Sequence, residues 1–459
     1  MKSEGIAISP LQVWTQVKQA FLRTEKTRIL LRGSVGSLVL RACSFALRLL
    51  LAVVLARLLG VSDYGIYAYA VTWLGLLAIP TMLGLDQVLL RYVAAYKQTR
   101  SWPTLKGLLY FSGALALGAT AIVSLVSIGI VAIFSHADWE FRATMWITIG
   151  LLPIVVLAQL RQASLRGLDR PVAAQIPENI VYPGLLILLV AGAFLLKGAA
   201  LNVPHVALAN AGAWVGAFLV GTVLLVRSMP EPVRASHRTY DRPAWLTMVP
   251  PLLFSAGAYQ VLSRADVLIL GALGSNRDLG LYAVASRGAE LMLFMCSAIT
   301  LAGVSLFSSI YATGDREELQ QFTTLATRII FWSSLPVYIL LMVLAPWVQR
   351  LFGAEFVEGA GVMRILLTTF FLSSLGGFVD PMLNMAGHQR DVAFVMGIAA
   401  ALNVGLSLVL IPSYGKLGAA IASGTSLMLL KGTLALVLYK RVGIIGFPFI
   451  PGKFVRQTH

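Results

Sequence analysis

Apolar residues fill long stretches of this 459-residue chain, and short polar segments separate them. Each stretch is about as long as the ~20 residues that an α-helix needs to cross the hydrocarbon of a bilayer. Only helices and closed barrels satisfy the backbone in lipid, and these stretches are too long for barrel strands. We therefore expect an all-α polytopic protein with about twelve spans, at 34–59, 66–90, 107–134, 143–162, 174–196, 204–227, 246–272, 279–311, 322–345, 360–386, 391–412 and 416–439.

Composition supports a membrane protein. Hydrophobic residues make up 58% of the chain, charged residues only 12%, and the mean hydropathy is +0.81. A soluble domain cannot hide that much apolar surface. The net charge of +16 would suggest nucleic acid in a soluble protein. Here the cations lie mostly in short loops between spans, so we expect no nucleic-acid partner.

No cofactor is expected. The sequence lacks a phosphate loop of the G-x-x-x-x-G-K type, so the chain has no nucleotide motor of its own. Its two cysteines, Cys43 and Cys296, fall inside apolar stretches and predict neither a disulfide nor a metal site.

Loop charge predicts the orientation. Cations gather after the second, fourth and sixth spans and in the C-terminal tail, whereas alternate loops such as 135–142 are poor in them. Because cytoplasmic loops collect Lys and Arg, both termini are expected in the cytoplasm. The expected parts are a cytoplasmic amphipathic segment, an N-terminal lobe, a cytoplasmic linker, a C-terminal lobe and a cytoplasmic tail, at 1–33, 34–228, 229–245, 246–440 and 441–459.

The two halves resemble each other in sequence. DYGIYA at 63–68 has a counterpart in DLGLYA at 278–283, and LRGLDR at 165–170 has one in MAGHQR at 385–390. Six spans in each half keep both halves in one orientation. This pattern predicts a parallel internal repeat of two six-helix bundles, with a pseudo-two-fold axis along the membrane normal and a substrate cavity between them.

Charged residues inside the first span are the main candidates for function. Ser37, Arg41, Ser44 and Arg48 recur at steps of three and four, so they share one helix face. An arginine at depth costs about 2.5–3.5 kcal/mol, so this face must meet a partner or a wet cavity. One interpretation is a site for an anionic substrate, because guanidinium suits phosphate. The other is structural, with the arginines capping carbonyls or pairing with acids. We favour the site, because the arginines outnumber the local acids.

The second half carries different charges. Arg264 lies one residue out of register with Arg48, and either lines the same cavity or is neutralised by Asp266. Arg287 and Glu290 are spaced i,i+3, which lets them pair on one helix. A structural pair is favoured for them, and coupling to a proton or sodium gradient is the alternative.

Several motifs resemble those of polysaccharide biosynthesis flippases. LLGVSDYGIY at 58–67 follows the first span, DVLILG at 266–271 with GLY at 280–282 gives the matching stretch of the second half, and LRGLDR at 165–170 follows the fourth span. These segments are similar to signatures of the O-antigen and exopolysaccharide flippases in the multidrug/oligosaccharidyl-lipid/polysaccharide exporter superfamily.

The resemblance implies a MATE-like, V-shaped transporter that works by alternating access with a cationic central cavity. It implies an undecaprenyl-diphosphate-linked oligosaccharide as substrate, used for lipopolysaccharide or another surface polysaccharide at the bacterial cytoplasmic (inner) membrane. Partners would be membrane lipids, a polysaccharide polymerase and a chain-length regulator. Arg41 and Arg48 match the place where such proteins keep first-helix cations. With about twelve expected spans, this chain lacks the additional pair of spans found in the lipid II flippases.

Three other functions stay open. A small-molecule or multidrug antiporter would have the same fold, although cationic drugs favour acids or aromatics over arginine. A membrane-embedded glycan polymerase or glycosyltransferase would need long extracytoplasmic loops with paired carboxylates, and loops such as 135–142 are short. A transport-inactive scaffold in an envelope assembly is the third.

The expected topology can be tested by cysteine labelling. A membrane-impermeant maleimide applied to intact cells should modify an Ala137→Cys variant and spare a His237→Cys variant, because only the first lies in a cation-poor loop. Labelling of position 237 but not 137 would invert the orientation.

Overall fold

The computed structural model describes residues 25–134, 138–198, 201–247, 249–313, 315–377 and 379–448, and these ranges form helices and no strand. Most of the predicted amphipathic segment, 1–33, lies outside the described residues. From Glu25 onward the chain is helical as the beginning of α2.

The N-terminal lobe, or N-lobe, is built from the first half of the chain. Its elements are α2 (Glu25–Met82), α3 (Leu85–Gln98), α4 (Trp102–Phe134), α5 (Trp139–Gly150), α6 (Leu152–Gly167), α7 (Pro171–Ile176), η1 (Pro177–Val181), α8 (Tyr182–Lys197) and α9 (Val203–Ser228). Two short helices follow in the linker, α10 (Glu231–Ala235) and α11 (Arg242–Leu246).

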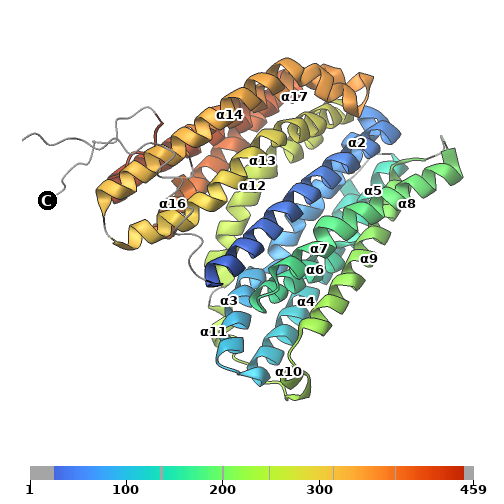
Figure 1. Ribbon diagram of the computed structural model, residues 1–459. Helices are drawn as coiled ribbons and strands as arrows, with labels where there is room; N and C mark the ends of the chain where they lie inside the picture. Colours follow the sequence, from blue (N-terminus) through green and yellow to red (C-terminus); the bar gives the residue numbers. More distant parts are fainter. Residues whose placement is uncertain are drawn as a thin grey trace, which may run out of the picture.

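The C-terminal lobe, or C-lobe, contains the remaining helices. They are α12 (Val249–Leu273), α13 (Asn276–Thr313), α14 (Arg316–Phe352), η3 (Ala354–Gly359), α15 (Ala360–Ser374), α16 (Val379–Met385) and α17 (Gln389–Val442). Figure 1 shows the blue-to-green N-lobe beside the yellow-to-red C-lobe.

Two helices double back on themselves. A straight α2 of 58 residues would be about 87 Å long, far more than a bilayer needs. It turns at Gly60, whose φ of 75° is a left-handed value that glycine adopts readily, and both ends of α2 lie at the same end of the molecule (Figure 1). Likewise α17 turns at Gly415, and an Arg441–Asp391 ion pair of 2.9 Å joins its two ends. We call the end with Gly60 and Gly415 the turn end.

Among the described residues, eight helical segments are long and apolar enough to cross a membrane. Two of them, α2 and α17, each supply two passes because of their turns. The helices α12 and α13, with 25 and 38 residues, are also long enough to cross. The described helices therefore provide the twelve passes that the hydrophobic pattern predicts. The second pass is broken between Met82 and Leu85, within the single predicted span 66–90.

The lobes share their cores near the turn end. One hydrophobic cluster joins Val61 and Tyr64 of α2 to Leu281 of α13. Another joins Tyr69 of α2 to Tyr282 of α13. Away from this end, each lobe has a cluster of its own. The second and eighth passes are thus part of the interior of both lobes.

Two glycines let the lobes approach at this end. A Cβ on Gly65 would lie 2.2 Å from the Asn276 carbonyl oxygen, and a Cβ on Gly280 would lie 1.9 Å from that of Val61. Gly65 and Gly280 are equivalent in the repeated motif, and Val61 and Asn276 are separated by the same interval. Each glycine therefore contacts the same carbonyl of the opposite repeat, as a pseudo-two-fold axis requires.

The predicted linker, 229–245, docks on the N-lobe. Lys106 Nζ of α4 donates to the carbonyls of Arg234 and Ser236, at 2.7 and 2.8 Å. Trp245 of α11 is fully buried, and its Nε1 donates to the Tyr96 hydroxyl at 3.1 Å. The linker is therefore a packed part of the N-lobe rather than a free polar loop.

Substitution at the glycine crossing should be costly. Gly65→Ala forces a methyl group into backbone, and overpacking of this kind costs about 1–3 kcal/mol. Gly113→Ala is the matched control, because it lies inside α4 with open space where its Cβ would go. Thermal denaturation in detergent should show a lower melting temperature for Gly65→Ala alone. Equal melting temperatures for the two variants would contradict the close approach.

Candidate substrate-binding site

Three arginines from both lobes lie at one depth. Arg48 is on α2, Arg264 on α12 and Arg287 on α13. Each is eleven or twelve residues from the turn end, which corresponds to about 17 Å of helix. Arg48 is accessible and its charge interacts with both of the others, so its side chain faces the space between the lobes.

The charge of this group is positive. Arg287 and Arg264 repel Arg48, whereas Glu290 attracts it. Glu290 itself pairs with Arg287 at 2.9 Å. One carboxylate among three guanidinium groups leaves an excess of positive charge. In a bilayer such an excess calls for water or an anion, because unpaired charge at depth is expensive.

Polar aromatic residues of the N-lobe border the arginines. Tyr64 is buried and its hydroxyl faces Arg287. Tyr182, at the start of α8, interacts with the hydroxyl of Tyr67 and donates to Asn210 Oδ1 at 2.7 Å. Its ring also packs on that of Trp214, with centroids 4.6 Å apart. These contacts fix the wall of the N-lobe on which Arg48 lies.

Asn179 is a site residue that sequence reasoning missed. Asn179 lies on the fifth pass, and its Oδ1 accepts a hydrogen bond from Arg48 Nη2 of the first pass at 2.8 Å. The available signal was the run Pro177-Glu178-Asn179, a polar interruption inside the apolar stretch 174–196. Such an interruption is costly in lipid unless it faces protein or a wet cavity.

The predicted stripe on the first span divides in the structure. Arg41 and Arg48 are exposed, whereas Ser44 between them is buried. Arg41 lies seven residues farther from the turn end, about 10 Å along the helix. The side chain of Ser37 lies outside the described residues. The structure thus groups Arg48 with the arginines of the C-lobe and places Ser44 against protein.

Asp266 is used inside the C-lobe. Its carboxylate accepts hydrogen bonds from the Tyr282 hydroxyl, from Ser423 Oγ at 2.9 Å and from the backbone N–H of Val267 at 2.8 Å. These three donors hold it in a buried position between α12, α13 and α17. Asp266 therefore ties C-lobe helices together, and its charge interacts with Arg264 as well.

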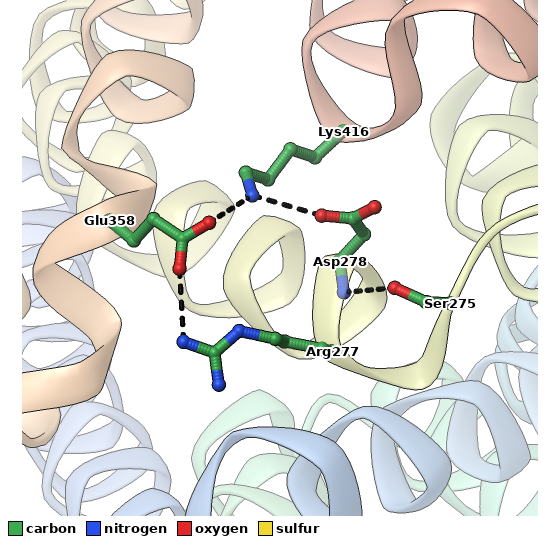
Figure 2. A network of polar contacts seen from close by, with 5 residues as sticks. All are labelled: Ser275, Arg277, Asp278, Glu358 and Lys416. Atoms are coloured by element: carbon green, nitrogen blue, oxygen red, sulfur yellow. Dashed lines mark hydrogen bonds and ion pairs between the residues drawn. The ribbon is translucent and has the colours of Figure 1, made fainter.

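A network of charges at the turn end belongs to the C-lobe alone. Lys416 Nζ lies between Asp278 and Glu358, at 2.9 and 2.7 Å, and Arg277 pairs with Glu358 at 3.0 Å. Figure 2 shows these side chains converging from α13, η3 and α17, with Asp278 capped by Ser275. Positive and negative charges are equal in number here, so the network links helices rather than forming a site for an anion.

A cavity of about 500 Å³ lies within the C-lobe, away from the three arginines. Its walls are mostly apolar and include Leu372, Leu436 and Phe447. Its charged lining residue, Lys431, pairs with Asp380 at 2.7 Å. Elsewhere in the described part of the chain, no three His, Cys, Asp or Glu residues gather as metal ligands.

Two families match the sequence. The family described as "Polysaccharide biosynthesis protein" matches residues 30–302, and the MatE family matches residues 251–409. The "Probable low-salt glycan biosynthesis flippase Agl15" of Haloferax volcanii is 24% identical over 402 residues, which cover 86% of this chain and 81% of that protein.

Solved structures share the fold. The inward-facing form of a multidrug resistance MATE family transporter has a TM-score of 0.75 and 17% identity, and the match covers 87% of this chain and 94% of that one. The lipid II flippase MurJ in an inward closed conformation has a TM-score of 0.70 and 14% identity, with 88% and 87% covered.

The relative is named a flippase, and these neighbours are a transporter and a flippase. With its long apolar helices, the chain is a multi-pass membrane protein that shares their fold. The first family match covers more than half of the sequence. The chain therefore belongs to the polysaccharide biosynthesis protein family.

Proposed function

We propose that this protein moves an undecaprenyl-diphosphate-linked oligosaccharide across the bacterial cytoplasmic membrane for the synthesis of a surface polysaccharide. The observation that carries the proposal is the convergence of Arg48, Arg264 and Arg287 from both lobes at one depth, with Glu290 as the carboxylate among them. A diphosphate offers many acceptors and negative charge, which suits several guanidinium groups. A site divided between two lobes also suits alternating access.

The direction of transport follows from the expected topology. With both termini in the cytoplasm, the linker side faces the cytoplasmic leaflet where lipid-linked sugars are assembled. A polysaccharide polymerase and a chain-length regulator would use the product on the other side. The names of Agl15, a glycan biosynthesis flippase, and MurJ, a lipid II flippase, support a lipid-linked glycan as substrate class.

A multidrug antiporter is the second candidate, because a structural neighbour bears that description. The charge of the site separates the two functions. A cationic drug would be repelled by three arginines. It would gain little from Glu290, because that carboxylate is already paired with Arg287. The diphosphate remains the better fit.

Substitution of Arg48 tests the proposed site. Arg48→Ala should lower surface glycan about tenfold or more, because hydrogen bonds to charged groups are the strong ones. Arg48→Lys keeps the charge but loses the planar fork, so it should be partly active. Arg41→Ala should be milder, because Arg41 lies farther from the other two arginines. The measurement is surface glycan in a strain lacking the native protein, normalised to membrane protein level.

Full activity of the Arg41→Ala, Arg48→Ala double variant would overturn this assignment. Both residues would then have only a structural role on the first pass.

Removal of the carboxylate should strengthen anion binding. The Arg287 and Glu290 side chains are 42% and 32% exposed, so breaking the pair should cost no more than about 1 kcal/mol and leave protein abundance unchanged. Glu290→Gln should tighten the binding of inorganic pyrophosphate, because it removes the negative charge that competes for the arginines. Calorimetry on purified protein measures this.

Glu358→Gln is the control for that experiment, because it removes a carboxylate from the network at the turn end. Equal effects of the two variants on pyrophosphate affinity would indicate a general charge effect. A collapse in the abundance of Glu290→Gln would show that the pair is structural.

A further inference from the structure

The fifth pass contains a π-helical turn, η1, between α7 and α8. Its cause is visible in the sequence. Pro183 has no N–H to donate to the Asn179 carbonyl, four residues earlier, and the Tyr182 N–H instead bonds to the Pro177 carbonyl, five residues earlier. π-helical turns are rare in proteins, and many of those that occur lie at functional sites. They change the direction in which consecutive side chains point.

One residue of the turn is anchored inside the N-lobe. Glu178 is buried and pairs with the buried Arg161 of α6. Arg161 also donates to the Phe218 carbonyl at 2.7 Å and lies against Gly221 of α9, where a Cβ would be 2.1 Å from its Cζ. The turn is therefore held to both the fourth and the sixth passes.

The next residue reaches the substrate site. Asn179 Oδ1 accepts from Arg48 Nη2 at 2.8 Å, so the anchored turn fixes one nitrogen of the guanidinium. A guanidinium has five N–H donors, and this contact uses one of them. It leaves the other donors available to an anion. A neutral amide holds the arginine without cancelling its charge, which a carboxylate in the same place would do.

We propose that Asn179 is a positioning residue that orients Arg48 toward the diphosphate of the substrate. The η1 turn, anchored by Arg161 and Glu178, holds Asn179 in position. This inference rests on the proposed function. Its physical basis is preorganisation: an arginine already held in its binding orientation loses less conformational freedom when the anion arrives.

The test is binding of geranylgeranyl diphosphate to the full-length protein in lipid nanodiscs, with geranylgeraniol as the probe without phosphate. Asn179→Leu should weaken diphosphate binding about fivefold to tenfold and leave binding of the alcohol unchanged. Asn179→Asp should weaken it more, because the new carboxylate neutralises Arg48. Gln175→Leu is the control, because Gln175 is on the same pass and bonds to the Pro171 carbonyl nearby.

A double-mutant cycle separates positioning from general structure. In an Arg48→Ala background, Asn179→Leu should cause no further loss, because the two residues act as one unit. Additive losses, or an equal loss of geranylgeraniol binding, would overturn the positioning role. So would unchanged binding in Asn179→Leu when Arg48→Ala is impaired. Unchanged binding in Arg48→Ala itself would instead overturn the proposed function.

Discussion

The close backbone contact at Gly65 and Gly280 determines how the two lobes meet. Because each glycine rests on a carbonyl of the opposite repeat, the second and eighth passes cross without side chains between them. Arg48 precedes the turn at Gly60 by twelve residues and Arg287 follows Asn276 by eleven, so the two guanidinium groups lie at a similar depth, where their charges interact. A larger residue at the crossing would separate the lobes and, with them, the charges that form the site.

The sequence predicts the passes, because the cost of unpaired backbone in hydrocarbon dominates their pattern. It predicts the repeat because DYGIYA at 63–68 recurs as DLGLYA at 278–283. It does not predict Asn179, since the π-turn that aims this residue depends on Pro183 and on an anchor that only the folded N-lobe provides. Nor does helical spacing distinguish Ser44 from Arg48, because neighbours on other passes decide which of them is buried. The side-chain partners of Asp266 come from α13 and α17, 16 and 157 residues away along the chain, and the sequence pattern links neither of them to it.

The lobes share a backbone plan but differ in charge. In the C-lobe, Lys416 links Glu358, at the start of the tenth pass, to a neighbouring carboxylate. In the N-lobe, Glu140 at the start of the fourth pass accepts from the neutral Asn202 at 3.0 Å and repels Asp63. The C-lobe is thus cross-linked by charge at the turn end, whereas the N-lobe depends there on packing. The lobes also contribute unequal charge to the candidate site, where Arg48 of the N-lobe interacts with two arginines of the C-lobe.

The docked linker has a mechanical consequence. Thr239 lies against Gly107 of α4, where a Cβ would be 1.9 Å from the Thr239 carbonyl oxygen, and the Thr239 N–H donates to the Pro103 carbonyl at 3.1 Å. With Trp245 buried as well, the linker is packed against the N-lobe at both its middle and its end. The covalent pivot between the lobes is then the short junction of α11 with α12, rather than the whole polar segment. Because α12 begins at this junction, a rotation of the C-lobe about it would move Arg264 relative to Arg48.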